Sequence, residues 1–120
     1  MENEFKIRFP GGYEVTDLFN DNIDINIFLP NGEIYFGTAF TIPNVQYLMG
    51  KEGSDYFWAT NMFVVKNLAR ETIRTAVAQS LKDNYFSFIF SQIGTIDKKE
   101  YLEGSSFSDI LDMTGDRDII

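Results

Sequence analysis

The sequence contains no cysteine and no histidine among its 120 residues. Without cysteine no disulfide can form, and because small secreted domains often depend on disulfides, a reducing compartment is favoured. Without histidine, neither a Ser-His-Asp triad nor a Cys-His pair can be built from protein groups. Zinc sites of the usual Cys and His kind are excluded as well. We therefore expect a protein that is not an enzyme, with no catalytic residues, no metal site and no cofactor.

A basic leader and long hydrophobic runs are also missing. The chain begins Met1-Glu2-Asn3-Glu4, whereas a signal peptide begins with basic residues and continues into an apolar run. No stretch approaches the ~20 apolar residues that cross a bilayer. The sequence predicts a cytoplasmic protein that has no membrane partner.

Basic residues are scarce, because 10 Lys and Arg stand against 18 Asp and Glu, which gives a net charge of −8. Phosphate backbones and anionic lipids would be repelled on average, so nucleic acid is not expected as a partner. Four of the bases lie on or beside one expected helix, and we interpret them as its solvated face. They are Lys66, Arg70, Arg74 and Lys82.

Hydrophobic residues, in contrast, are abundant. They make up 44% of the chain and include 12 Phe, 6 Tyr and 1 Trp. A chain of this length with this much apolar area predicts one domain over residues 1–120 with a packed core. Residues 114–120 are expected to form a frayed tail.

The clearest local signal is a hairpin centred on Asn31-Gly32. Apolar and polar residues alternate on both sides of this pair, and Asn-Gly favours a two-residue type I′ turn. Such a turn fixes the register of the two strands. The predicted cross-strand pairs are Leu29 with Ile34, Ile27 with Phe36, Ile25 with Thr38, Ile23 with Phe40 and, on the other face, Phe28 with Tyr35.

Periodicity and capping residues predict three further elements. A strand is expected over residues 4–9. A short helix is expected to begin after Thr41, to carry an apolar stripe of Ile42, Val45, Leu48 and Met49, and to end at Gly50. A longer helix, capped by Asn67, is expected over residues 68–82.

The remaining elements are less sharply defined by their pattern. Residues 56–59 and 62–65 are predicted to form a second hairpin around Thr60-Asn61, and a single strand with a bulge is the alternative. Residues 85–93 fit both periods, and we favour a helix over a strand. A short helix is expected after Ser105 or Ser106. Together these elements predict an α+β fold in which two or three helices pack on one face of an antiparallel sheet of four to five strands.

Acidic residues are unevenly distributed along the chain. Residues 9–50 contain five acids and no base, and residues 97–120 contain seven acids and three bases. Solubility explains such a surface, and docking of a basic partner by complementary charge is the functional alternative. Aromatic residues ringed by acids are suitable anchors for a protein partner. The candidate partner-binding residues are Asp24, Phe28, Glu33, Tyr35, Tyr56 and Trp58.

Trp58 has two interpretations. Large aromatic residues in a β-type run are mostly packed, so we expect Trp58 in the core. If the second face of the sheet is instead a binding surface, Trp58, Tyr56 and Phe28 are partly exposed in the free protein.

The central part of the chain also carries a resemblance to known proteins. The segments Asn31 to Phe36, Thr41 to Met49, Tyr56 to Ala59 and Met62 to Glu71 resemble small uncharacterised bacterial proteins of this length, over residues 23–93. That resemblance carries no catalytic signature and transfers no activity to this chain. In size, acidity and lack of motifs the chain also looks like the immunity proteins of bacterial toxin systems.

The leading hypothesis is therefore a non-enzymatic acidic module that binds another protein, such as an immunity protein that blocks a basic toxin or nuclease. Two alternatives belong to other classes. One is a structural homo-oligomer, and the other is a small-molecule-binding domain or an enzyme that depends on carboxylates.

Overall fold

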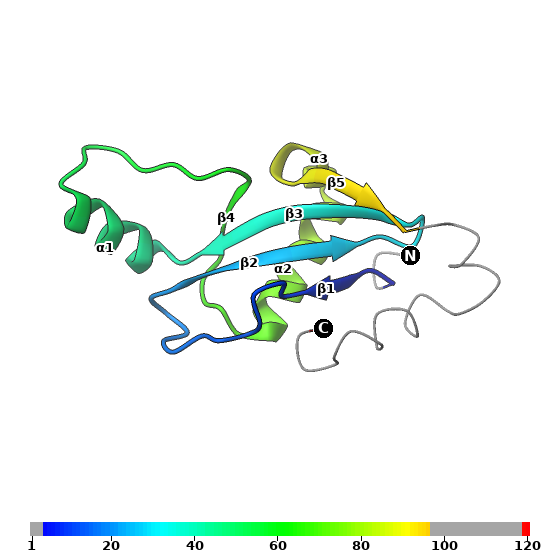
Figure 1. Cartoon of the computed structure of the whole chain (residues 1–120), viewed down its shortest axis with the longest axis horizontal. Helices are drawn as coiled ribbons and strands as arrows, with labels where there is room; N and C mark the ends of the chain where they lie inside the picture. The colour runs from blue at the N-terminus through cyan, green and yellow to red at the C-terminus, as the bar shows by residue number, and fades with distance from the viewer. Residues whose placement is uncertain (1–3, 97–118) are drawn as a thin grey trace.

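The computed structural model describes residues 4–96, 119 and 120. The elements lie in one sheet with helices around it, an α+β arrangement (Figure 1). In chain order they are β1 (Lys6–Arg8), β2 (Asn22–Phe28), β3 (Glu33–Phe40), α1 (Ile42–Glu52), β4 (Met62–Val64), α2 (Arg70–Lys82), α3 (Phe86–Ile89) and β5 (Ser91–Thr95).

The five-stranded sheet is mixed, so the expectation of an antiparallel sheet is wrong. β1 pairs with β2, and β2 with β3, in antiparallel fashion. Two strands share the other edge of β3, one after the other along its length. β5 runs antiparallel to residues 33–36, and β4 runs parallel to residues 38–40. β4 is parallel because the chain returns from β3 through α1, and such a crossover, unlike a tight turn, brings a strand back in the same direction.

The core lies on one face of this sheet. Ile23, Ile25 and Ile27 of β2 are all buried, as their alternation with polar residues predicts. Figure 1 shows α2 behind the sheet, and its residues Ile73 and Val77 belong to the same buried cluster. The cluster also contains Phe5, Ile7, Phe9, Ala39, Val65, Leu68, Phe86 and Phe90.

The β2–β3 hairpin forms at Asn31-Gly32, but its register differs from the predicted one by one residue. Leu29 and Glu33 enclose a three-residue turn, in which the Gly32 N–H donates to the Leu29 carbonyl (2.9 Å) and the Leu29 N–H donates to the Glu33 carbonyl (2.9 Å). Pro30 suits the first central position of a type I turn, and Gly32 then takes the left-handed position with φ +92°. The prediction failed because it ignored Pro30.

The corrected register brings large residues opposite small ones. Ile23 pairs with Ala39, Ile25 with Gly37, and Ile27 with Tyr35. The predicted pairs Leu29–Ile34, Ile27–Phe36, Ile25–Thr38 and Ile23–Phe40 are therefore wrong, and Phe28 pairs with Ile34 instead of Tyr35. Gly37 leaves space above β3 on the core face, and the ring of Phe90 occupies it.

α1 begins where the sequence predicts and ends later. The buried Thr41 is the N-cap, and its Oγ1 accepts a hydrogen bond from the Asn44 N–H (3.3 Å). Gly50 lies inside the helix, and Gly53, with φ +66°, terminates it. α1 lies beyond the end of β3 and not over a face of the sheet (Figure 1). Ile42 of the predicted apolar stripe is consequently exposed.

The second predicted hairpin is absent. Residues 56–59 form no strand, and the segment continues irregularly to Asn61, where φ is +52°. The strand that follows, β4, pairs with β3. The predicted helix over residues 68–82 appears as α2, but it begins at Arg70 and the prediction that Asn67 caps it is wrong. The N-cap is Ala69, and Asn67 Oδ1 accepts a hydrogen bond from the Ala69 N–H (3.0 Å) before the helix begins. The helix favoured over residues 85–93 is confirmed only for the single turn of α3 and is wrong from Ser91, where β5 begins.

The end of the chain returns to β1. The Ile7 N–H donates to the Ile120 carbonyl (2.9 Å), and the Ile120 N–H donates to the Ile7 carbonyl (2.8 Å). The sequence predicts a frayed tail over residues 114–120, and the last residue of that range is instead paired with β1. The short helix expected after Ser105 or Ser106, and residues 114–118, lie outside the described residues.

Candidate protein-binding surface

The six candidate residues do not form one surface. Phe28 is 8% exposed, so it is not available as an anchor. Tyr35 lies on the core face, where its ring packs edge-on against Phe86 at 4.8 Å between centroids. Successive residues of a strand point to opposite faces, and the one-residue change of register separates Phe28 and Tyr35.

The two candidate acids on the hairpin are engaged within the protein. Asp24 is exposed, and its Oδ1 accepts a hydrogen bond from the Thr38 hydroxyl (2.8 Å) across the β2–β3 pair. The Tyr35 hydroxyl donates to Glu33 Oε1 (3.0 Å). Burial raises the pKa of Tyr35, and the Glu33 carboxylate raises it further by accepting this hydrogen bond and by its negative charge.

Tyr56 and Trp58 are 70% and 69% exposed, so the prediction that Trp58 belongs to the core is wrong. Between them, Phe57 is half-buried, and its ring packs edge-on against Phe40 at 5.4 Å between centroids. Because Phe57 packs on the sheet, the side chains of its neighbours Tyr56 and Trp58 point away from the sheet into solvent. The aromatic run alternates between exposed and half-buried side chains, as a strand would, but none of the strands that the structure describes pairs with it.

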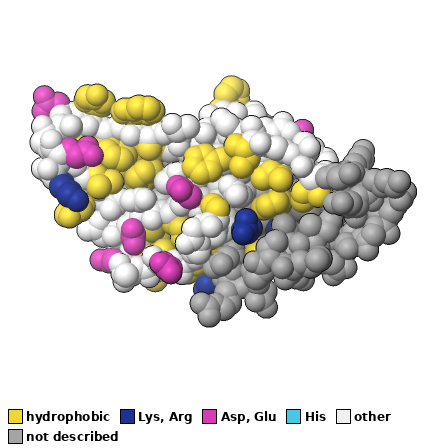
Figure 2. Space-filling model, in the orientation of Figure 1, with side chains coloured by type: hydrophobic (Ala, Val, Ile, Leu, Met, Phe, Trp, Pro, Cys, Tyr) yellow, Lys and Arg dark blue, Asp and Glu magenta, His cyan; other side chains and the backbone are white. Residues whose placement is uncertain are grey.

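We call the N-cap Thr41, α1 and the segment that follows, together residues 41–59, the α1 end. Ile42 and Tyr47 on α1 are also exposed, at 61% and 55%. Figure 2 shows hydrophobic side chains at the left end of the molecule, with acidic side chains beside them. Tyr47 is not among the candidates predicted from the sequence. Its position outside the predicted apolar stripe of the helix would have indicated that its side chain is exposed.

Acids reach the α1 end from two parts of the chain. Glu52 and Asp55 belong to it directly. The loop before β2 is tied to α1 through Asn44, which accepts a hydrogen bond from Asn22 (2.9 Å) and donates one to Asn20 (3.2 Å). Backbone pairing with Thr41 places Asp21 at the same end, and Asp24 lies beside Thr38 near the end of β3. Lys51 is the only basic residue between Phe9 and Val65 in the sequence, so this end has a negative potential.

The bases near α2 have a structural role that the sequence did not indicate. The Arg70 guanidinium lies 4.0 Å from the centre of the Tyr13 ring. Arg74 Nη1 donates to the carbonyl oxygens of Phe5 (3.0 Å) and Ile120 (3.2 Å), and burial lowers the pKa of Arg74. The interpretation of Arg74 as part of a solvated face is therefore wrong, because this side chain joins β1 and the chain end to α2.

Tyr13 holds the loop after β1 against the start of α2. Its hydroxyl donates to the Leu68 carbonyl (2.6 Å). Burial raises the pKa of Tyr13, and the nearby positive charge of Arg70 opposes this increase. The shifted pKa of Tyr13 therefore reflects its packing between the loop and α2.

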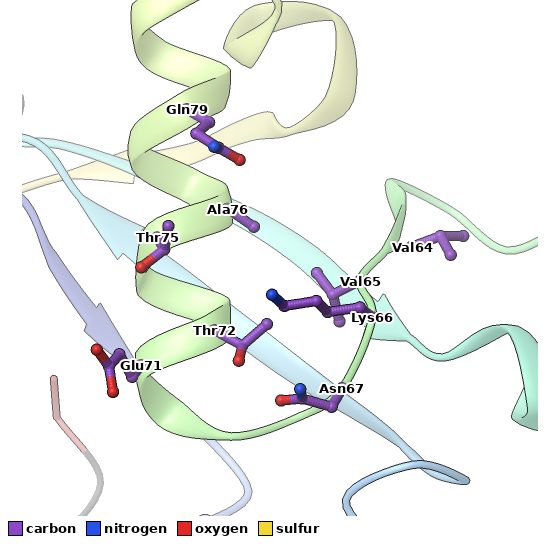
Figure 3. A pocket seen from close by; sticks show the side chains of 9 residues that line it. All are labelled: Val64, Val65, Lys66, Asn67, Glu71, Thr72, Thr75, Ala76 and Gln79. Carbon is purple, nitrogen blue, oxygen red and sulfur yellow. The ribbon is translucent and has the colours of Figure 1, made fainter.

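A cleft lies between α2 and β4. It has a volume of about 590 Å³ and lies between the helix and the chain that leaves β4 (Figure 3). Its lining is mostly polar and consists of Val64, Val65, Lys66, Asn67, Glu71, Thr72, Thr75, Ala76 and Gln79. No sequence pattern indicates it, because it depends on where β4 lies relative to α2.

Two observations concern cofactors and membranes. Among residues 4–96, 119 and 120, no group of three or more acids is placed to hold a metal ion. In the same part of the chain, no helix has the length and apolar character needed to cross a membrane.

Comparison with family models, curated proteins and solved structures finds no match to this chain.

Proposed function

We propose that this protein is a non-enzymatic module of the bacterial cytoplasm that binds a basic protein through the α1 end. In this proposal it acts as an immunity protein, which neutralises a basic toxin or nuclease by covering the surface that the toxin needs. The observation that carries the proposal is the exposure of Trp58 and Tyr56 at an end of the molecule rich in acids.

An exposed tryptophan leaves a large apolar area in water in the free protein, and the same area contributes strongly to binding when a partner covers it. Trp and Tyr bury a large area for little loss of side-chain freedom, and they are enriched among the residues that dominate binding energy. At the α1 end these rings stand beside Phe57, which fixes their backbone by packing against Phe40. Preorganised aromatic side chains of this kind lower the entropy lost on binding.

The surrounding acids would determine the choice of partner and the rate of association. Complementary charge steers encounter and is weakened by salt, whereas buried aromatic contacts govern dissociation. A basic partner is therefore expected to associate more slowly at high salt and to dissociate at nearly the same rate.

Affinity capture from the native host tests the proposal. The full chain should retain a basic protein, and the purified pair should lose about 30-fold in affinity on Trp58→Ala, which corresponds to about 2 kcal/mol. Phe88→Ala is the matched control, because Phe88 is 83% exposed but lies on α3. Retention of the same protein by wild type and Trp58→Ala alike, at low and high salt, would contradict the proposal.

A second experiment separates steering from anchoring. Glu52→Gln combined with Asp55→Asn should reduce the association rate constant and its dependence on salt, with little change in the dissociation rate constant. If the double variant leaves the association rate unchanged, the acids at the α1 end do not select the partner.

A further inference from the structure

β4 has one edge without a partner strand among the residues that the structure describes. The strand order β1-β2-β3-β4 places it at the border of the sheet. On the β3 side, the Asn61 carbonyl accepts from the Thr38 N–H (3.1 Å), and the Val65 N–H donates to the Phe40 carbonyl (2.8 Å). Backbone groups alternate in direction along a strand, so the N–H and C=O of Met62 and Val64 point outward.

The other borders of the sheet differ from this one. The outer edge of β1 is paired with Ile120 at Ile7. β5 has an irregular register against β3 between Ile34 and Tyr35, and such bulges discourage further pairing. The outward groups of Met62 and Val64 are two donors and two acceptors in a regular geometry.

The cleft beside α2 adjoins this edge, since it begins at Val64 and Val65. In Figure 3, the Lys66 side chain points across the cleft towards α2, and Ala76 and Gln79 face it from the helix. Glu71 also contributes to the lining, but its carboxylate points to the other side of α2 (Figure 3). The charge directed into the cleft is therefore positive, in a chain whose net charge is −8.

We propose that this edge and cleft receive an extended peptide segment of a partner protein, which adds to β4 as a further strand and places a carboxylate beside Lys66. In this mode of recognition the main-chain hydrogen bonds give affinity, and alternate side chains give specificity. The small side chain of Ala76 leaves room for those of the segment. The proposal concerns a surface separate from the α1 end and does not depend on it.

A second copy of this chain fits the edge less well than a foreign segment. Antiparallel pairing could place Met62 opposite Met62, Met62 opposite Val64, or Val64 opposite Val64. In these three registers, Lys66 would lie opposite Trp58, Thr60 or Met62 of the other copy. None of them carries a carboxylate, so self-pairing would leave the cation of the cleft without its complement.

Selection of a random linear peptide library on the immobilised full chain tests the proposal. Selected peptides should share an Asp or Glu at one position, and Lys66→Gln should weaken them about tenfold or more. Val64→Pro should abolish binding because it removes an outward N–H and leaves the hydrogen bonds to β3 intact. Val64→Thr, which keeps the N–H, is the matched control, and circular dichroism verifies the fold of each variant.

Hydrogen exchange measured by NMR gives a readout that does not depend on these variants. On addition of a selected peptide, the amides of Met62 and Val64 should gain protection, whereas those of Phe63 and Val65, already directed to β3, should change little. Uniform protection, or none, would overturn the proposal.

Two further outcomes would also overturn it. A dimer of the wild-type chain in light scattering that Val64→Pro dissociates would mean that a second copy occupies the edge. Peptide binding that survives Val64→Pro and is lost on Trp58→Ala would place the peptides at the α1 end. That last result would leave the proposed function standing, so the failures of the two proposals can be told apart.

Discussion

The ring of Phe90 lies against the backbone of Gly37, where a Cβ atom would overlap the ring carbons Cδ1 and Cε1. Phe90 is almost fully buried, so its ring has little room to move away. Gly37 lies near the point on β3 where pairing with β5 gives way to pairing with β4. The close approach lets Phe90 enter the core between the two short strands.

Gly37→Ala should therefore destabilise the fold by about 1–3 kcal/mol, the usual range for overpacking a core. Chemical denaturation monitored by circular dichroism measures the change. Gly94→Ala, on β5, is the matched control, because a Cβ at Gly94 meets nothing within 4 Å. Equal stability of Gly37→Ala and wild type would show that Phe90 can be displaced at no cost.

Asn61 should be needed for both its backbone conformation and its amide. Its Nδ2 donates to the Ile89 carbonyl (3.0 Å) and to Ser91 Oγ (2.9 Å), which joins the start of β4 to α3 and β5. Asn61→Asp keeps the size and the tolerance for positive φ but cannot donate, so we expect a loss of about 1–3 kcal/mol. Asn84→Asp, at the other non-glycine residue with positive φ among those described, should cost only about 0.5 kcal/mol, because it adds a negative charge just after the C-terminal end of α2. Equal losses in the two variants would contradict the role of the Asn61 amide.

Trp58 reports directly on the α1 end, since it is the single tryptophan. Its emission should resemble that of tryptophan in water, and acrylamide should quench it strongly. Trp58→Ala should change the free energy of unfolding by less than about 0.5 kcal/mol, as at most exposed positions. Phe57→Ala should cost about 1–2 kcal/mol, because it removes the packing on Phe40. Blue-shifted emission that resists quenching would place Trp58 in a core.

Alkaline pH should weaken the fold through Tyr35. Its pKa is raised in the folded protein, so the folded state holds the hydroxyl proton more tightly than the unfolded state does. The resulting stability is complete below the unfolded pKa, which is 10.0, and is lost as the pH rises through the higher folded pKa. Urea unfolding at neutral pH and at about pH 11 measures the loss.

Tyr35→Phe should reduce this alkaline loss, because the group that releases the proton is gone. The part that remains is attributed to Tyr13, whose pKa is also raised. Tyr56→Phe, at an exposed position, serves as the matched control. The same alkaline decline in Tyr35→Phe and in wild type would contradict the assignment.

Local signals predicted those parts of the fold that depend on neighbours in sequence. The isoleucines of β2 and the Thr41 cap are set by alternation and capping, and both appear as expected. The turn residue Pro30 was equally local, and reading it correctly would have given the register of the hairpin.

Long-range pairing could not be predicted from the same signals. Met62–Val64 has the composition of a strand whichever way it pairs, and nothing local shows that β3 already has β2 on one side and receives β4 in parallel on the other. Trp58 was misplaced for this reason. An aromatic β-type run is buried only if it pairs with a strand or packs on a face of the sheet. Of residues 56–58, it is Phe57 that packs on the sheet, against Phe40.

The divided outer edge of β3 also bears on resistance to aggregation. A strand as long as β3, with eight residues, would present a long template for edge-to-edge assembly if it stood at the border of the sheet. Two short strands that run in opposite directions cover it instead, and a peptide that extended along both would have to pair in parallel with one and antiparallel with the other, with a different hydrogen-bond pattern for each. An extended segment can therefore engage three residues of β4 without the pairing spreading along the whole border, which favours a reversible complex over a fibril.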